Sequence, residues 1–257
     1  MARRGQTSTN ATVPDEVAAI RAAIKECMDQ VDEVGRRVGG AKYGIYCFYD
    51  YDDEPIYVGQ TAESLRQRIG RHLTNQRTDA VAMNVLDPFE VLTVEMYPLW
   101  YLASPEYESM SGGKRKLNDK GRDVLNRAEF TVYQRALTQS RFHSVLNEAD
   151  MLASETVELP KSYRGRIVPD EVYRLRRHPD VRIARRAMTV ANLSRVISER
   201  DVSAGLRRTL HTQSLRLQYL SGKRLEEFGG VFPVESDAET GEDSEGYLEM
   251  AGSAEDA

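Results

Sequence analysis

Residues Tyr43 to Gly59 read YGIYCFYDYDDEPIYVG, and this pattern predicts the central part of the fold. Its first half is rich in aromatic and β-branched residues, which favour strands. Asp50 to Pro55 is polar and predicts a turn, after which the chain returns as a second strand. Two tripeptides, Gly44-Ile45-Tyr46 and Tyr57-Val58-Gly59, therefore face each other across a predicted hairpin, with ten residues between them.

Helical and strand patterns continue on both sides of this hairpin. Before it, Pro14 suits a first helical position, and the acidic residues behind it suit the positive end of a helix dipole. The apolar spacing predicts helices, the aromatic and β-branched runs predict strands, and glycine-containing polar runs predict loops. The expected elements are helices over 14–38, 62–75 and 124–139, a third strand over 89–97, a polar loop over 111–123 and a linker over 154–169.

Composition limits the class of protein. With 257 residues and 40% hydrophobic residues, the chain is long enough to form a packed core. No apolar run approaches the roughly 20 residues that a transmembrane helix needs, so no membrane partner is expected. The N-terminus resembles no secretory signal, and Cys27 and Cys47 have no metal-type spacing. These features predict a cytoplasmic protein.

Charge is distributed unevenly, although the net charge is only −5. Residues 161–224 hold 16 basic and 5 acidic residues, whereas 226–257 hold 11 acidic and no basic residues. This uneven distribution of charge favours a basic surface that binds polyanions. The acidic tail that follows would be solvated or would cover that surface. A basic, solvated helical surface is the alternative. The densest basic cluster supplies candidate DNA contacts at Arg176, Arg177, Arg185 and Arg186.

The two tripeptides, on adjacent strands within the order helix, strand, strand, helix, strand, helix, resemble the GIY-YIG nuclease family, and in particular its restriction-type endonucleases. The resemblance covers residues 42–150. It implies an α+β fold: a small three-stranded antiparallel sheet flanked by helices, here with a C-terminal helical extension. The resulting division has four parts: 1–41, a disordered tail and N-terminal helix; 42–150, the nuclease domain; 151–228, a basic helical region; and 229–257, an acidic disordered tail.

The resemblance also implies a site. Arg68 and His72 follow the second tripeptide, and because they lie four residues apart on a predicted helix they share a face. Arg68 suits the scissile phosphate, because a guanidinium is always charged and forked. His72 would contact phosphate or position water, Glu129 would bind one Mg2+ or Mn2+ ion, and Asn147 would brace the site.

The proton acceptor is expected to be one of the two tyrosines. The family has had this role assigned to either one or to both. We favour Tyr46 as the base, with Tyr57 positioning water or phosphate. A phenol has a pKa of about 10, so a base near neutral pH needs electrostatic help. Gln60 stands where some family members have a lysine, which weakens a lysine-assisted route.

Each candidate site residue also has a purely structural explanation. Taken singly, each tyrosine could be a packed strand aromatic, and Arg68, His72, Glu129 and Asn147 could be ordinary helix or turn residues. The basic run after Gly112-Gly113 lacks the spacing of a nucleotide-binding loop. It suggests contacts with the DNA backbone instead, from Lys114 and Arg115, and Arg71 is a further candidate contact.

The predicted function is a metal-dependent DNA endonuclease in restriction or phage defence. A double-strand cut would need a homodimer or two successive nicks, and a DNA methyltransferase encoded nearby would fit restriction. Homing and repair nucleases are alternatives within the family. The alternative from another class is a catalytically idle DNA-binding or regulatory protein that keeps the fold.

Overall fold

A four-stranded antiparallel sheet forms the centre of the computed structural model, which describes residues 15–74, 85–147, 151 and 153–231. The strands are β1 (Gly44–Tyr49), β2 (Pro55–Thr61), β3 (Thr93–Pro98) and β6 (Tyr163–Arg166), in the spatial order β2-β1-β3-β6. In the β1–β2 pair, Tyr46 lies opposite Gly59, so the two tripeptides meet at this one pair, and Tyr57 lies opposite Phe48. Sheet and helices together confirm the predicted α+β fold.

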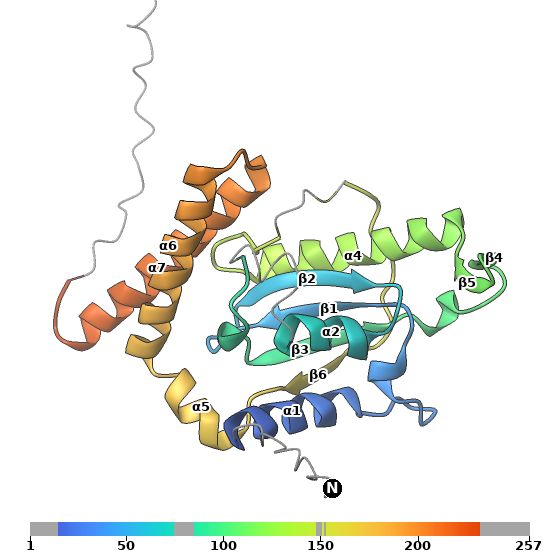
Figure 1. The fold of residues 1–257 in the computed structure, drawn as a ribbon, viewed down its shortest axis with the longest axis horizontal. Coiled ribbons are helices and arrows are strands. Elements are labelled where there is room, and N and C mark those ends of the chain that lie inside the picture. The colour runs from blue at the N-terminus through green and yellow to red at the C-terminus, as the bar shows by residue number, and fades with distance from the viewer. Residues whose placement is uncertain (1–14, 75–84, 148–150, 152, 232–257) are drawn as a thin grey trace, which may run out of the picture.

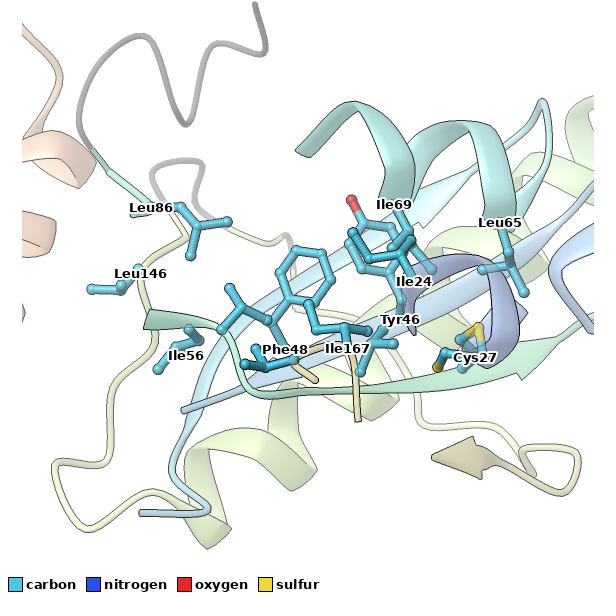
Figure 2. Close-up of a cluster of buried hydrophobic side chains, with 14 of the residues drawn as sticks. Ile24, Cys27, Tyr46, Phe48, Ile56, Leu65, Ile69, Leu86, Leu146 and Ile167 are labelled. Atoms are coloured by element: carbon cyan, nitrogen blue, oxygen red, sulfur yellow. The ribbon is translucent and has the colours of Figure 1, made fainter. Parts of the chain in front are cut away.

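Helices cover both faces of the sheet (Figure 1). Helices α1 (Asp15–Met28) and α2 (Leu65–Thr74) lie on one side, and α4 (Asp119–Gln139) lies on the other. Side chains alternate along a strand, and every residue of β1 is buried because this strand has covered faces on both sides. Tyr46 and Phe48 pack towards α1 and α2, whereas Ile45, Cys47 and Val58 pack towards α4. Figure 2 shows the first of these clusters.

The C-terminal part is helical, as expected, with α5 (Asp170–Arg176), α6 (Pro179–Glu199) and α7 (Ala204–Glu227). Figure 1 shows α6 and α7 side by side at one end of the sheet. Their apolar residues Leu193, Val196 and Leu206 join the same hydrophobic cluster as Tyr46 and Phe48. The C-terminal helices therefore share a core with the sheet.

Two segments expected to be irregular contain strands. The loop expected over 111–123 contributes to a two-stranded hairpin of β4 (Glu108–Ser111) and β5 (Lys114–Leu117), and α4 begins five residues earlier than expected. The linker expected over 154–169 contains β6, which pairs with β3 and adds a fourth strand to the predicted three. Both strand pairs are only four residues long, too short for a clear sequence pattern.

Helix α1 ends ten residues before the predicted end at Val38. The Asp32 carboxylate accepts hydrogen bonds from the backbone N–H groups of Val34 and Arg36, which stabilises a turn in place of helix. Val31 and Val34, which lie at helical spacing within the predicted helix over 14–38, are exposed. Short 3₁₀ helices occupy Val38–Gly40, Pro88–Glu90 and Trp100–Leu102, and the second of these delays the start of β3.

The predictions of disorder at both termini lie outside the described residues, except for the start of the second segment at 229–231. None of the helices in the described ranges is long and apolar enough to cross a membrane.

Candidate active site

The glycine of the second tripeptide makes room for the tyrosine of the first. A Cβ built on Gly59 would lie 2.4 Å from the Tyr46 hydroxyl oxygen and 2.5 Å from the ring carbon that carries it. No other side chain fits in this space without moving the ring. The Tyr46 hydroxyl is buried, and among the described residues it has no hydrogen-bond partner. Burial raises the pKa of Tyr46 far above its ordinary value, and the nearby Arg68 offsets this only in part.

Helix α2 places Arg68 and His72 beside the tyrosines, as their spacing predicts. The His72 ring centroid lies 5.8 Å from that of Tyr46 and 5.4 Å from that of Tyr57. Both ring nitrogens of His72 are buried and, within the described part of the chain, unpartnered. Burial, with the positive charge of Arg68 and Arg71, lowers the pKa of His72 to about 4, so the ring is neutral at pH 7.

Glu129 reaches the site from α4, on the other side of the sheet. Burial raises the pKa of its carboxyl to about 7, although Arg68 and hydrogen bonds from Gln60 lower it. A carboxyl group with a pKa of about 7 is about half protonated at physiological pH, unless a nearby cation favours the charged form. No described basic residue forms an ion pair with Glu129.

Asn147 braces the outer edge of β2, which is the edge strand of the sheet. Its side-chain oxygen accepts a hydrogen bond from the backbone N–H of Val58 at 3.1 Å, and its amide nitrogen donates to the Val58 carbonyl at 2.7 Å. The backbone N–H of Leu146 also donates to the Ile56 carbonyl at 2.8 Å. The segment after α4 thus takes the place of a further strand and fixes β2 on either side of Tyr57.

A pocket of about 630 Å³ opens along this edge between α2 and α4. Tyr57, Arg68, Glu129 and Asn147 all line it, together with Gly59 and Gln60. Tyr46 and His72 do not line the pocket but lie against the ring of Tyr57. Residues distributed over ninety positions of sequence therefore converge on one cavity.

Gln60 is a member of the site that the sequence marked only as a departure from the family pattern. Its side-chain amide donates a hydrogen bond to the Asn126 oxygen at 3.0 Å, and it also hydrogen-bonds to Glu129. The available signal was its position, because a residue directly after Gly59 on β2 points to the face that α4 covers.

The pocket holds one half-buried carboxylate suited to a metal, that of Glu129. Among the described residues there is no group of three or more histidine, cysteine, aspartate or glutamate side chains that could hold an ion. A magnesium-like ion can be bound through one or two carboxylates and retain most of its waters. The partly protonated Glu129 fits such an ion, since the ion would supply the missing positive charge.

The basic residues expected to contact DNA differ in their exposure and in whether they already have a partner. Lys114 and Arg115 are exposed on the β4–β5 hairpin. Arg71 is half-exposed but pairs with Glu63. Arg177 is exposed beside Tyr173, whereas Arg176 is half-buried over the ring of Phe89.

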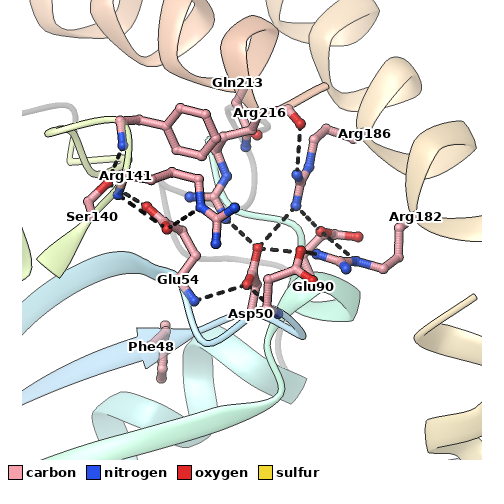
Figure 3. Close-up of polar contacts among 12 residues, drawn as sticks. Phe48, Asp50, Glu54, Glu90, Ser140, Arg141, Arg182, Arg186, Gln213 and Arg216 are labelled. Atoms are coloured by element: carbon pink, nitrogen blue, oxygen red, sulfur yellow. Dashed lines mark hydrogen bonds and ion pairs between the residues drawn. The ribbon is translucent and has the colours of Figure 1, made fainter. Parts of the chain in front are cut away.

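Arg186 corrects the prediction of a DNA contact at that position. Only 3% of the residue is exposed, and its guanidinium pairs with Asp50 and Glu90 inside the protein (Figure 3). The neighbouring Arg185 binds Asp87 at 2.8 Å and lies 3.7 Å from the centroid of the Phe89 ring. Much of the basic charge of α6 is thus neutralised internally.

Comparison with known families covers the part of the chain that holds the two tripeptides and α2. Residues 42–118 match the model of the GIY-YIG catalytic domain. This is a nuclease domain that cleaves phosphodiester bonds, it generally uses a divalent metal, and it implies DNA as the substrate. No curated protein and no solved structure matches the chain.

Proposed function

We propose that the chain, whose residues 42–118 form a GIY-YIG catalytic domain, is a metal-dependent DNA endonuclease whose active site is the pocket at the edge of β2. The observation that carries the proposal is the convergence of Tyr57, Arg68, Glu129 and Asn147 on that one cavity. A catalytically idle relative that had lost the activity would have no reason to keep all four.

Arg68 is the phosphate-binding group. Its Nε is buried and, among the described residues, unpartnered, so a donor is directed into the protein beside the cavity. A guanidinium stays charged and can donate two parallel hydrogen bonds to phosphate oxygens. It would neutralise charge on the phosphate as water attacks.

Tyr57 is the group that takes the proton from the attacking water. This reverses the roles expected for the two tyrosines, because the Tyr46 hydroxyl is buried with a raised pKa while Tyr57 lines the cavity. A base must reach its proton directly or through one water. Tyr46 and neutral His72 then hold the Tyr57 ring. Tyr57→Phe is expected to reduce cleavage more than Tyr46→Phe, and a larger loss from Tyr46→Phe would restore the first assignment.

Glu129 would hold the divalent ion, with Mg2+ or Mn2+ as candidates. When bound, such an ion supplies positive charge for the transition state and the leaving oxygen. Gln60 keeps the Glu129 carboxylate in place through its hydrogen bonds, and Asn147 keeps the backbone on both sides of Val58 in position.

The test is cleavage of supercoiled plasmid with Mg2+, with Mn2+ and with a chelator. Metal-dependent nicking or linearisation is expected, and Glu129→Ala should abolish it while DNA binding remains. Glu199→Ala, which removes an exposed carboxylate at the end of α6, is the matched control. Persistent absence of cleavage on varied unmodified DNA would favour the idle binding protein.

The biological setting proposed is restriction or phage defence, as for the restriction-type members of the family. Its support is the presence of a large helical region beside the nuclease domain, without a recognisable reader module of homing or repair enzymes. A DNA methyltransferase gene next to this one would support restriction. One site cuts one strand, so a double-strand cut predicts a homodimer, which light scattering in the presence of DNA would detect.

A further inference from the structure

The β4–β5 hairpin is a projecting element that the catalytic site does not use. Its strands pair from Glu108 opposite Leu117 to Ser111 opposite Lys114. Gly112 and Gly113 join them with φ angles of 58° and 73°. Two successive residues with positive φ form a tight turn whose twist matches that of paired strands, and glycine adopts it without strain. Figure 1 shows the hairpin beyond the end of α4.

The base of the hairpin is firmly attached to the sheet. The Glu108 carboxylate accepts hydrogen bonds from the Lys42 ammonium and the Tyr43 hydroxyl, both at 2.6 Å. Leu117 is buried, and the next residue, Asn118, donates its backbone N–H to the Tyr107 carbonyl at 2.9 Å. The hairpin therefore extends from a fixed base, with the turn at its far end.

Lys116 and Lys114 place positive charge along the hairpin, from the half near its base to its turn. Lys116 lies opposite Ser109 and Lys114 opposite Ser111, so one face presents two ammonium groups and two hydroxyls. Across the described ranges, no carboxylate forms an ion pair with either lysine. The adjoining cations on α4 differ, because Lys120 pairs with Glu106, Arg122 with Asp119 and Arg127 with Glu155.

The catalytic pocket leads towards this hairpin. Its wall on α4 runs from Phe130 back to Asp123, which is towards the N-terminus of the helix, where β5 ends. At about 1.5 Å of rise per residue, Glu129 lies about 15 Å along the axis from Asp119. At about 3.4 Å per base pair, a duplex laid along α4 would reach the hairpin about five base pairs from the cut.

We propose that the β4–β5 hairpin is an arm that binds the backbone of duplex DNA, with Lys114 and Lys116 contacting phosphates five or more base pairs from the scissile bond. The proposal rests on the proposed function in one respect, that DNA occupies the pocket. Serine hydroxyls and lysine ammonium groups are ordinary phosphate donors, and they position a duplex without reading its sequence.

The test is equilibrium binding to fluorescent random-sequence duplexes of about 10 and about 30 base pairs, in chelator, over a range of salt. The Lys114→Ala, Lys116→Ala double variant should bind the long duplex about 10-fold more weakly near 0.1 M salt, with a salt slope smaller by about two. Binding of the short duplex should weaken less, because fewer of its possible positions reach from the pocket to the hairpin. Arg195→Ala with Arg207→Ala, which removes two exposed cations from α6 and α7, is the matched control and should leave both affinities unchanged.

Wild-type affinity and slope in the hairpin variant would overturn the proposal, as would equal losses for both duplexes or an equal effect of the control. Because no divalent metal is present, the outcome is independent of cleavage. If the protein cuts plasmid but the hairpin variant binds DNA like wild type, the proposed function stands and the hairpin is not a DNA-binding arm. If the hairpin variant binds the long duplex more weakly but the protein cuts no plasmid, the arm stands and the nuclease function does not.

Discussion

At the scale of single residues, the site depends on how closely two side chains can approach. Gly44 and Gly59 both stand where a Cβ would collide with neighbours: with the Tyr97 carbonyl oxygen at 2.9 Å in the first case and with the Tyr46 hydroxyl in the second. The tripeptides are thus packing requirements as well as chemical signatures. Each glycine allows an aromatic or helical neighbour to lie against the strand.

Gly59→Ala should therefore damage both stability and cleavage. The added methyl must displace the Tyr46 ring in a close-packed core, which costs about 1–3 kcal/mol of unfolding free energy, and it should lower the cleavage rate at least 10-fold by moving Tyr57. Gly70→Ala in α2 is the control, because nothing lies within 4 Å of the new Cβ and alanine favours a helix over glycine by about 1 kcal/mol. Denaturant unfolding and plasmid cleavage measure both, and equal stability of the two variants would contradict the packing argument.

Glu129 predicts a pH dependence in the metal-free protein. Its pKa is raised from 4.5 in the unfolded chain to about 7, so the folded state binds the proton more tightly. The stabilisation is complete below pH 4.5 and is lost as pH rises through about 7. Glu129→Gln removes this dependence, so the variant should gain about 1–3 kcal/mol relative to wild type between pH 5 and pH 8. Unfolding at several pH values in chelator measures the difference, and parallel curves would exclude the raised pKa.

At the scale of elements, a buried ion cluster joins the β1–β2 turn to α6 and α7 (Figure 3). The Asp50 carboxylate, 2% exposed, lies within 3.4 Å of guanidinium nitrogens of Arg182, Arg186 and Arg216. Burial lowers the pKa of Arg216 to about 10, which still leaves it charged at pH 7. The Asp50 charge is therefore needed to offset three buried cations.

Asp50→Asn should destabilise the fold by about 3–5 kcal/mol, because it keeps the side-chain shape and removes the shared negative charge. The matched control is Asp53→Asn in the same turn, where the carboxylate is exposed and, among the described residues, forms an ion pair with Arg164 alone. That change should cost less than about 1 kcal/mol. Chemical denaturation of both variants is the measurement, and similar midpoints would show that α6 and α7 dock by apolar contacts alone.

The sequence predicted the elements that carry a strong period or motif, and missed those that are fixed by distant contacts. The β1–β2 hairpin was predicted from its aromatic and β-branched residues, and α2 and α4 were predicted from helical spacing. Strand β6 has no such pattern: it fits because Gly165 leaves room for the Cys27 sulfur, 2.4 Å from where a Cβ would be. The pocket residues followed from the family resemblance. The internal role of Arg186 did not, because its partners Asp50 and Glu90 lie far away in sequence.

At the scale of the whole molecule, the C-terminal helices pack into the same core as the sheet. Val172, Leu193 and Leu206 lie in one hydrophobic cluster with Tyr46 and Phe48, and β6 completes the sheet. The proposed boundary at residue 150 is thus crossed by both apolar and strand contacts. The positions of α2 and β2, which carry much of the proposed site, therefore depend on a core to which the C-terminal helices contribute.

A truncated chain ending at residue 150 should therefore fail to fold, whereas the full chain should unfold in one cooperative transition. The control is truncation after residue 231, which retains every described contact. Thermal unfolding followed by circular dichroism and by tyrosine fluorescence distinguishes the cases. A stable 1–150 fragment, or two separate transitions in the full chain, would establish independent domains.

The contact between Gly59 and the Tyr46 ring also restricts the register in which β1 and β2 can pair. A shift of one residue along β2 would turn its side chains to the wrong faces. A shift of two would place Tyr57 or Thr61 opposite Tyr46, and either side chain would occupy the volume that the ring needs. Of these alignments only the native one accommodates the ring, so the close approach of Gly59 and Tyr46 selects the register of β1 and β2.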